Sequence, residues 1–235
     1  MPLGFGQSIL GAPPAAAATD YTIPTSAFSN DGNTIALYHL DNSDNDSSSN
    51  GYNFTTSGGF SSSTKQFGTH SGDLTQTGDF FQYSTSGNYG PHDGTNPRDY
   101  TLECFVNYSN FTGAAQSTFL SNLMQPAGDQ AGNSYIWFGL GTDGKLKMFH
   151  FNVVSATGTT VFNTGQFYHI ALTYDTSDNK YRGYANGFKE FETAAVTLTS
   201  GNTPAFKMTF GLANAGDTNG FIDEIRISDT VRYSA

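Results

Sequence analysis

The chain has 235 residues and a formal net charge of −10, and only 13% of its residues are charged. Its length suits one large all-β domain or two small ones, and a chain of this size buries roughly 70% of the surface that it exposes when unfolded. The acidity argues against a basic face for a phosphate backbone, so no nucleic-acid partner is expected. With 20 Phe, 13 Tyr and 27 Gly, the composition favours many short strands and turns over helices.

The first 19 residues contain no charged residue, and Gly, Pro and Ala separate their few apolar side chains. This composition predicts an extended arm without a core of its own. We expect residues 1–28 to form an N-terminal anchoring arm and linker, and residues 29–235 to form one domain. The alternative is an arm that folds back on its own domain. The side chains expected to anchor the arm on a partner protein are Leu3, Phe5, Ile9 and Leu10.

From residue 34 onward, short segments rich in β-branched and aromatic residues alternate with turn signals. No apolar run approaches the roughly 20 residues that cross a membrane, so no membrane insertion is expected. This spacing of strands and turns is typical of a two-sheet sandwich. The predicted strands are Ile35–Leu40, Tyr52–Thr56, Phe80–Ser84, Tyr100–Tyr108, Thr118–Leu123, Tyr135–Leu140, Lys145–Asn152, Phe206–Leu212 and Phe221–Ser228, together with a hairpin within Phe167–Asn186.

The segment Phe167–Gly187 (FYHIALTYDTSDNKYRGYANG) carries the clearest strand pattern. Two strands with a period of two flank the polar residues 175–179, and Asn186-Gly187 is a strong turn signal. A hairpin of this kind needs neighbouring strands and a second sheet beneath it. We therefore expect the rest of the domain to be arranged around this hairpin.

Three further stretches accompany the hairpin: IALYHLDNSDNDSSSNGYNF (Ile35–Phe54), YTLECFVNY (Tyr100–Tyr108) and GFIDEIRISDTVRY (Gly220–Tyr233). In this order the four stretches resemble laminin-G-like domains of the concanavalin A-like lectin and glucanase family. The resemblance implies an all-β fold, a two-sheet antiparallel jelly-roll sandwich preceded by the extended N-terminal arm. It says much less about function, because this sandwich hosts many unrelated activities.

Two acidic residues are candidate metal ligands. By alternation Asp223 shares a strand face with Ile225 and Ile227, and an inward carboxylate needs several N–H donors or a cation. Members of the family commonly hold a structural calcium ion, and the resemblance implies Asp46, in the acidic loop 41–50, and Asp223 as its ligands. Calcium takes six to eight oxygen ligands, which such a loop offers. The alternative is that both carboxylates accept hydrogen bonds within turns.

Catalytic motifs do not emerge from the sequence. Glucanases of this fold carry Glu-x-Asp-x-Glu on one strand face, which supplies the acid and nucleophile of a retaining mechanism, and this chain has no such motif. Its nearest equivalent, Glu190-Phe191-Glu192, is interpreted as a solvated sheet edge, and Asp223 and Glu224 are expected on opposite faces. The five histidines are scattered singly, without a nucleophile motif. We expect no catalytic residues and no enzymatic activity.

Sugar binding is compatible with the aromatic content and with the Asn-, Asp- and Gly-rich loops. Because core packing must absorb most of the Phe and Tyr residues, the sequence does not identify the glycan-binding residues. The aromatic side chains available are Trp137, Tyr135, Tyr89, Tyr184 and Phe149.

An uncharged arm followed by a lectin-like jelly roll in an acidic, lysine-poor chain resembles virion proteins of tailed bacteriophages. The leading hypothesis is a non-enzymatic component of the virion surface: a capsid decoration, head-fibre or tail-associated protein. Its arm is expected to bind other virion proteins and its domain to bind host surface glycans, with many copies or a homo-oligomer raising the avidity. The alternative is a free or cell-surface calcium-dependent carbohydrate-binding module.

Overall fold

The computed structural model describes residues 20–87, 89–111, 120–123, 136–150, 152–199, 206–211 and 219–234, and their regular structure is all β-strand. The fold class predicted from the sequence is therefore confirmed. The expected anchor residues Leu3, Phe5, Ile9 and Leu10 lie outside the described residues, so their role stays a prediction. Within the described ranges, no helix is long and apolar enough to cross a membrane.

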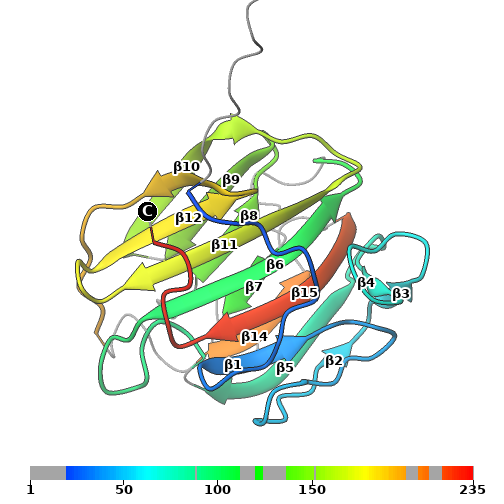
Figure 1. Ribbon diagram of the computed structural model, residues 1–235, viewed down its shortest axis with the longest axis horizontal. Helices are drawn as coiled ribbons and strands as arrows, with labels where there is room; N and C mark the ends of the chain where they lie inside the picture. Colours follow the sequence, from blue (N-terminus) through cyan, green and yellow to red (C-terminus); the bar gives the residue numbers. More distant parts are fainter. Residues whose placement is uncertain are drawn as a thin grey trace, which may run out of the picture.

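The larger of the two layers is an antiparallel sheet (Figure 1). Its strands are β1 (Thr34–Tyr38), β3 (Gly59–Ser61), β4 (Ser71–Asp73), β6 (Tyr100–Tyr108), β11 (Phe167–Asp175), β12 (Lys180–Ala185), β13 (Phe188–Glu192) and β15 (Gly220–Ser228). They follow the order β13-β12-β11-β6-β15-β4-β3, and β1 pairs with the C-terminal half of β15. The predicted hairpin is β11–β12, and β6 pairs with the other side of β11, so the hairpin lies inside this sheet as expected.

The second layer consists of two smaller antiparallel sheets. One has the order β10-β9-β8-β7 and the other β14-β5-β2. Because β14 packs beside β7, the two sheets together cover the inner face of the large sheet (Figure 1). The strands are β2 (Thr55–Thr56), β5 (Phe80–Gly87), β7 (Leu120–Leu123), β8 (Ile136–Leu140), β9 (Lys145–His150), β10 (Val154–Val161) and β14 (Phe206–Gly211).

The hydrophobic core lies between the layers, and β6 shows how the sequence builds it. Leu102, Cys104 and Val106 alternate along this strand and belong to the core. The intervening residues, among them Glu103 and Phe105, point to the outer face and are buried as well. All nine residues of β6 are therefore buried, which requires a cover on the outer face of the large sheet.

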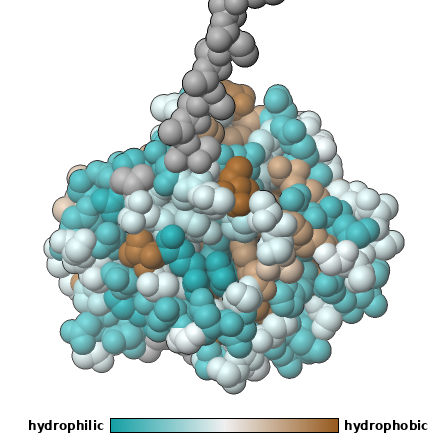
Figure 2. Space-filling view, viewed as in Figure 1, coloured by the Kyte–Doolittle hydropathy of each residue, from teal (hydrophilic) through white to brown (hydrophobic). Residues whose placement is uncertain are grey.

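That cover is an N-terminal strap, residues 20–33, which runs across the outer face of the large sheet (Figure 1). Its Tyr21 and Phe28 pack on the sheet, and Tyr233 from the C-terminal end joins them. The resulting face is mostly hydrophilic, with hydrophobic side chains in separate small patches (Figure 2). The described part of the predicted linker, residues 20–28, thus packs on the sandwich, while the domain boundary at residue 28 stays a prediction.

The closing strand β15 departs from the predicted alternation. Its register against β6 shifts between Asp223 and Arg226, and Glu224 has a φ of 51°. This bulge places Asp223 opposite Phe105 on the outer face, and Glu224 beneath the strap, where it accepts a hydrogen bond from the Phe28 N–H. The predictions that Asp223 shares the face of Ile225 and that Asp223 and Glu224 lie on opposite faces are therefore wrong. The core-facing residues of β15 are Ile222, Ile225 and Ile227.

Candidate functional site

The strands β8 and β9 place two aromatic rings side by side on the outer face of the second layer. Ile136 and Phe138 of β8 and Met148 of β9 point into the core, so the intervening Trp137 and Phe149 point away from it. Trp137 and Phe149 are direct partners across the strand pair. Their ring centroids are 5.9 Å apart at an interplanar angle of 48°, and both side chains are partly exposed. The arrangement is an aromatic pair held by a two-stranded ladder.

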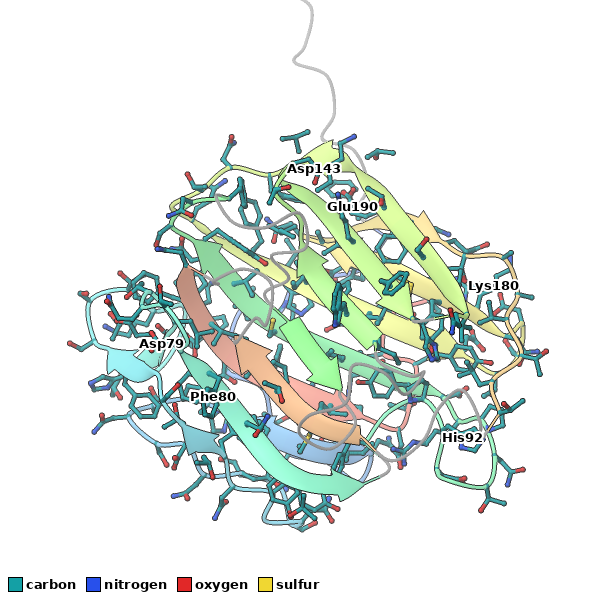
Figure 3. All side chains as sticks on the ribbon, turned by 180° about the vertical axis from the view of Figure 1, so that it is seen from behind. Asp79, Phe80, His92, Asp143, Lys180 and Glu190 are labelled. Atoms are coloured by element: carbon teal, nitrogen blue, oxygen red, sulfur yellow. The ribbon has the colours of Figure 1, made fainter. Side chains whose placement is uncertain are left out.

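The neighbouring strand β10 adds hydroxyl groups to this pair. Ser155 lies opposite Phe149, and Thr157 lies opposite Lys147 of β9. Ser155 and Thr157 are exposed, and each hydroxyl can donate one hydrogen bond and accept others. We call Trp137, Phe149, Lys147, Ser155 and Thr157 the β8–β10 surface; it lies on the layer that faces the viewer in Figure 3.

The polar end of the β8–β10 surface lies at the turn between β8 and β9, where Figure 3 labels Asp143. Lys147 reaches this turn, and its Nζ lies 2.9 Å from Oδ2 of Asp143. A Cβ atom on Gly141 would lie 2.7 Å from Cε of Lys147, so this glycine leaves room for the lysine stem. Lys145 is two residues further along the same face of β9 and forms no ion pair with any described carboxylate.

The other aromatic candidates from the sequence are less accessible. Tyr89 and Tyr184 are buried, and Tyr135 lies outside the described residues. Tyr89 forms a cluster with Tyr52 and Tyr83 at 5.0 and 5.8 Å between ring centroids, and this cluster packs against the core. In the sequence, Trp137 and Phe149 can be distinguished from the core aromatics because they alternate with apolar core residues along β8 and β9.

The predicted calcium ligand Asp46 already has a full set of hydrogen bonds. Its Oδ1 accepts the N–H groups of Leu37 and Ser48 at 3.0 and 2.7 Å. Its Oδ2 accepts the Ser48 hydroxyl and the Tyr52 N–H at 2.7 and 2.9 Å. These bonds tie the loop 41–53 to β1. They agree with the alternative stated from the sequence, in which the carboxylate accepts hydrogen bonds within a turn.

The second predicted ligand, Asp223, is different. Its Oδ2 accepts the N–H groups of Gln66 and Phe67 at 2.8 and 3.0 Å, while its buried Oδ1 has no hydrogen-bond partner among the described residues. Burial raises the pKa of this carboxyl to about 7, with a further contribution from the neighbouring Glu224. An orphaned buried oxygen suits a hard cation.

The structure does not join Asp46 and Asp223 through a common hydrogen-bond partner. In the described part of the chain, no group of three or more His, Cys, Asp or Glu side chains is arranged to hold a metal ion. The loop 66–70 instead wraps around carboxylates, since Asp41 Oδ1 also accepts the N–H groups of Thr69 and His70. Asp46 is thus satisfied without a cation, Asp223 offers one oxygen that is unbonded among the described residues, and the calcium ion stays a prediction.

Sequence reasoning missed a buried polar network centred on Glu103. Arg226 Nε donates to its Oε1 at 2.8 Å, and His169 Nε2 lies 3.1 Å from its Oε2. Tyr233 donates its hydroxyl to Oε2, and Tyr21 of the strap lies 2.7 Å from the other ring nitrogen of His169. Burial would raise the pKa of Glu103, but His169 and Arg226 hold it below its usual range. The network fastens both ends of the described chain to β6 and β11, and it is closed to solvent.

The acidic pair on β13 does not form a catalytic site either. Glu190 is 8% exposed, and its Oε2 accepts the N–H groups of Thr159 and Thr160 of β10 at 3.1 and 3.0 Å. Glu192 instead pairs with Lys180 at 2.6 Å. The edge position of β13 is confirmed, but the prediction that Glu190 is solvated is wrong, because a register shift in the β12–β13 ladder turns it toward β10.

Comparisons with known proteins agree with this architecture. A family model described as the concanavalin A-like lectin/glucanases superfamily matches residues 77–235, more than half of the chain. Domain 4 of AbnA, an extracellular GH43 arabinanase from Geobacillus stearothermophilus solved with arabinotriose, has a TM-score of 0.58 and 21% identity, over 84% of this chain and 93% of that one.

For a second solved structure, the match covers a smaller share of that structure's own chain. A mutant of Trypanosoma rangeli sialidase with trans-sialidase activity has a TM-score of 0.51 and 10% identity, over 74% of this chain and 27% of that one. No curated protein matches the sequence. Both likenesses concern the fold.

Proposed function

The chain belongs to the concanavalin A-like lectin/glucanases superfamily, and from this membership we propose that it is a carbohydrate-binding module without catalytic activity of its own. The observation that carries the proposal is the partly exposed ring pair of Trp137 and Phe149. Aromatic faces bury large apolar areas against a ligand, and the flanking hydroxyls of Ser155 and Thr157 can bond sugar hydroxyls. The arabinotriose bound to the similar arabinanase domain makes arabinan a reasonable first ligand to test.

The absence of catalytic activity is supported by the acidic residues themselves. The sequence has no Glu-x-Asp-x-Glu motif. Glu190 is buried against two backbone N–H groups, and Glu192 is engaged with Lys180. Neither is placed as the acid or the nucleophile of a glycosidase, which need two carboxyls on either side of a bound sugar.

The leading hypothesis from the sequence, a tailed-phage virion component on the virion surface, has less support than the alternative adopted here. The arm that would anchor it lies outside the described residues, and neither solved structure named above is a phage protein. Binding to virion proteins, a multi-copy or homo-oligomeric assembly and a location on the virion therefore stay predictions, as does calcium dependence of glycan binding.

The proposal is tested by replacing Trp137 with alanine. Removing an aromatic side chain from the centre of a binding surface usually costs about 2 kcal/mol or more, so we expect affinity for a bound glycan to fall at least about tenfold. Binding is measured by isothermal titration calorimetry, starting with arabino-oligosaccharides and then with ligands found on a glycan array.

The matched control is Phe188→Ala, which removes a ring that is 40% exposed on the edge strand of the other layer. This variant should bind like the original protein. If Trp137→Ala binds every ligand as tightly as the original protein, or if Phe188→Ala loses binding instead, the site is not the β8–β10 surface.

A further inference from the structure

Positive charge is scarce in this chain, and most of it is neutralised. Against 20 Asp and Glu there are ten Lys and Arg. Among the described residues, six of these cations pair with carboxylates: Lys147, Lys180, Lys189, Arg182, Arg226 and Arg232. A lysine whose positive charge is not neutralised by an acidic partner is therefore unusual in this protein.

Lys145 is such a lysine, and it lies on the strand that carries the ring pair. Lys145, Lys147 and Phe149 alternate along β9 with the core residues Leu146 and Met148, so all three point to the outer face. From Phe149 to Lys145 the strand covers about 13 Å, enough to contact more than one residue of a polysaccharide. The side chain of Lys145 is partly exposed and forms no ion pair with the described carboxylates.

We infer that the β8–β10 surface, extended by Lys145, selects glycans that bear carboxylate or sulfate groups. This inference rests on the proposed function. The ring pair stacks on the sugar, Ser155 and Thr157 bond its hydroxyls, and Lys145 supplies the positive charge that an acidic substituent requires. Lys147 contributes less, because Asp143 neutralises it at 2.9 Å. The net charge of −10 repels polyanions in general, so an acidic glycan is held only where a cation faces it.

The experiment compares acidic polymers with neutral ones of the same backbone. Polygalacturonate is paired with its methyl-esterified form to test carboxylates, and dextran sulfate is paired with dextran to test sulfates. Affinity is measured by affinity electrophoresis and by titration calorimetry at low and at physiological salt. We expect the original protein to prefer at least one acidic polymer over its neutral partner, and salt to reduce that preference.

Variants then assign the preference to individual residues. Lys145→Gln should weaken binding to the preferred acidic polymer about fivefold and leave binding to neutral sugars unchanged. Lys145→Arg should retain the preference. Asp143→Asn should strengthen acidic binding, because it frees the charge of Lys147. The matched control is Lys65→Gln, which removes a lysine whose Nζ donates to the Ser62 carbonyl in the loop between β3 and β4.

The outcomes separate this inference from the proposed function. If Trp137→Ala abolishes binding but the neutral polymers bind as tightly as the acidic ones, selection for acidic glycans is refuted and the carbohydrate-binding function stands. An unchanged acidic affinity of Lys145→Gln also refutes it. If the original protein binds none of these polymers and no ligand on a glycan array, both proposals fail.

Discussion

Asp223 is buried on the outer face of the large sheet, with one carboxylate oxygen bonded to two backbone N–H groups and the other without a hydrogen-bond partner in the part of the chain that the structure describes. Its pKa is raised to about 7, so the folded state holds a proton on this carboxyl that the unfolded state has released above about pH 4. Stability therefore falls as the pH rises from about 4 to about 7, because ionisation leaves a buried charge.

We predict that, in EDTA, Asp223→Asn raises the melting temperature at pH 8 and raises it less at pH 5, since asparagine keeps the shape and removes the charge. Thermal unfolding at both pH values checks this. The contrasting variant Asp46→Asn should be destabilised at pH 8, because that carboxylate accepts four hydrogen bonds.

The same melts test the predicted calcium ion. Calcium at Oδ1 of Asp223 would raise the melting temperature of the original protein at pH 8, and EDTA would lower it again. A melting temperature indifferent to both would reject the calcium site.

At the scale of residues, the sequence indicates correctly that Asp223 needs compensating partners, but it mispredicts the face of the sheet on which Asp223 lies. The sequence identifies Asp223 as a carboxylate that must be compensated, but strict alternation predicts it on the face of Ile225 and Ile227, where it does not lie. The bulge at Glu224 breaks that alternation, and nothing in the local sequence marks it, since a positive φ at a glutamate is uncommon.

At the scale of elements, the strap and the C-terminal segment are held on the sheet by the network around Glu103. The residue lies fully buried on β6, and its charge is compensated by Arg226 and His169. Removing one partner of a buried ion pair leaves the other charge uncompensated.

We predict that Glu103→Gln lowers the free energy of unfolding by about 3–5 kcal/mol at pH 7, as measured by urea denaturation. Because the pKa of Glu103 lies below its usual range in the folded state, its contribution is present above about pH 4.5 and is lost as the pH falls further. The difference between the variant and the original protein should therefore shrink in acid.

The matched control for this prediction is Glu192→Gln, which breaks partly exposed ion pairs on the edge strand and should cost less than about 1 kcal/mol. Equal effects of the two substitutions would show that the network around Glu103 does not hold the strap.

Strands with strong alternation were predictable, and those without it were not. Tyr100–Tyr108 and Phe167–Asp175 are found as the sequence indicates, because β-branched and aromatic residues alternate over nine positions. The strand Val154–Val161 (VSATGTTV) is not predicted from the sequence, since its Ser, Thr and Gly residues are equally typical of a loop. It forms because β9 and Glu190 provide its hydrogen-bond partners, which is information from distant parts of the chain.

At the scale of the whole molecule, the sandwich and its approximate extent followed from the sequence, whereas the packing of the strap did not. The sequence predicts that residues 20–28 belong to an arm and linker outside the domain. In the folded protein Tyr21, Ile23 and Phe28 bury the outer face of the large sheet. Such a contact depends on pairing with residues more than 140 positions away.

We predict that a chain lacking residues 1–19 keeps the stability of the sandwich, whereas a chain lacking residues 1–33 loses at least about 3 kcal/mol, because three apolar side chains no longer cover the sheet. Urea denaturation of the two truncated proteins checks this. Similar stabilities would mean that the strap is dispensable. Loss of oligomers already on deletion of residues 1–19 would support the predicted anchoring role of these residues.

The strap also makes the two outer faces of the sandwich different from each other. Its own chain occupies the outer side of the large sheet, while the ring pair and Lys145 lie on the opposite layer. A copy grafted onto a bead or a larger protein just ahead of Asp20 would be attached at the β12–β13 edge of the large sheet, with β8–β10 on the other layer. Fusions at that position should therefore leave the proposed glycan-binding surface accessible.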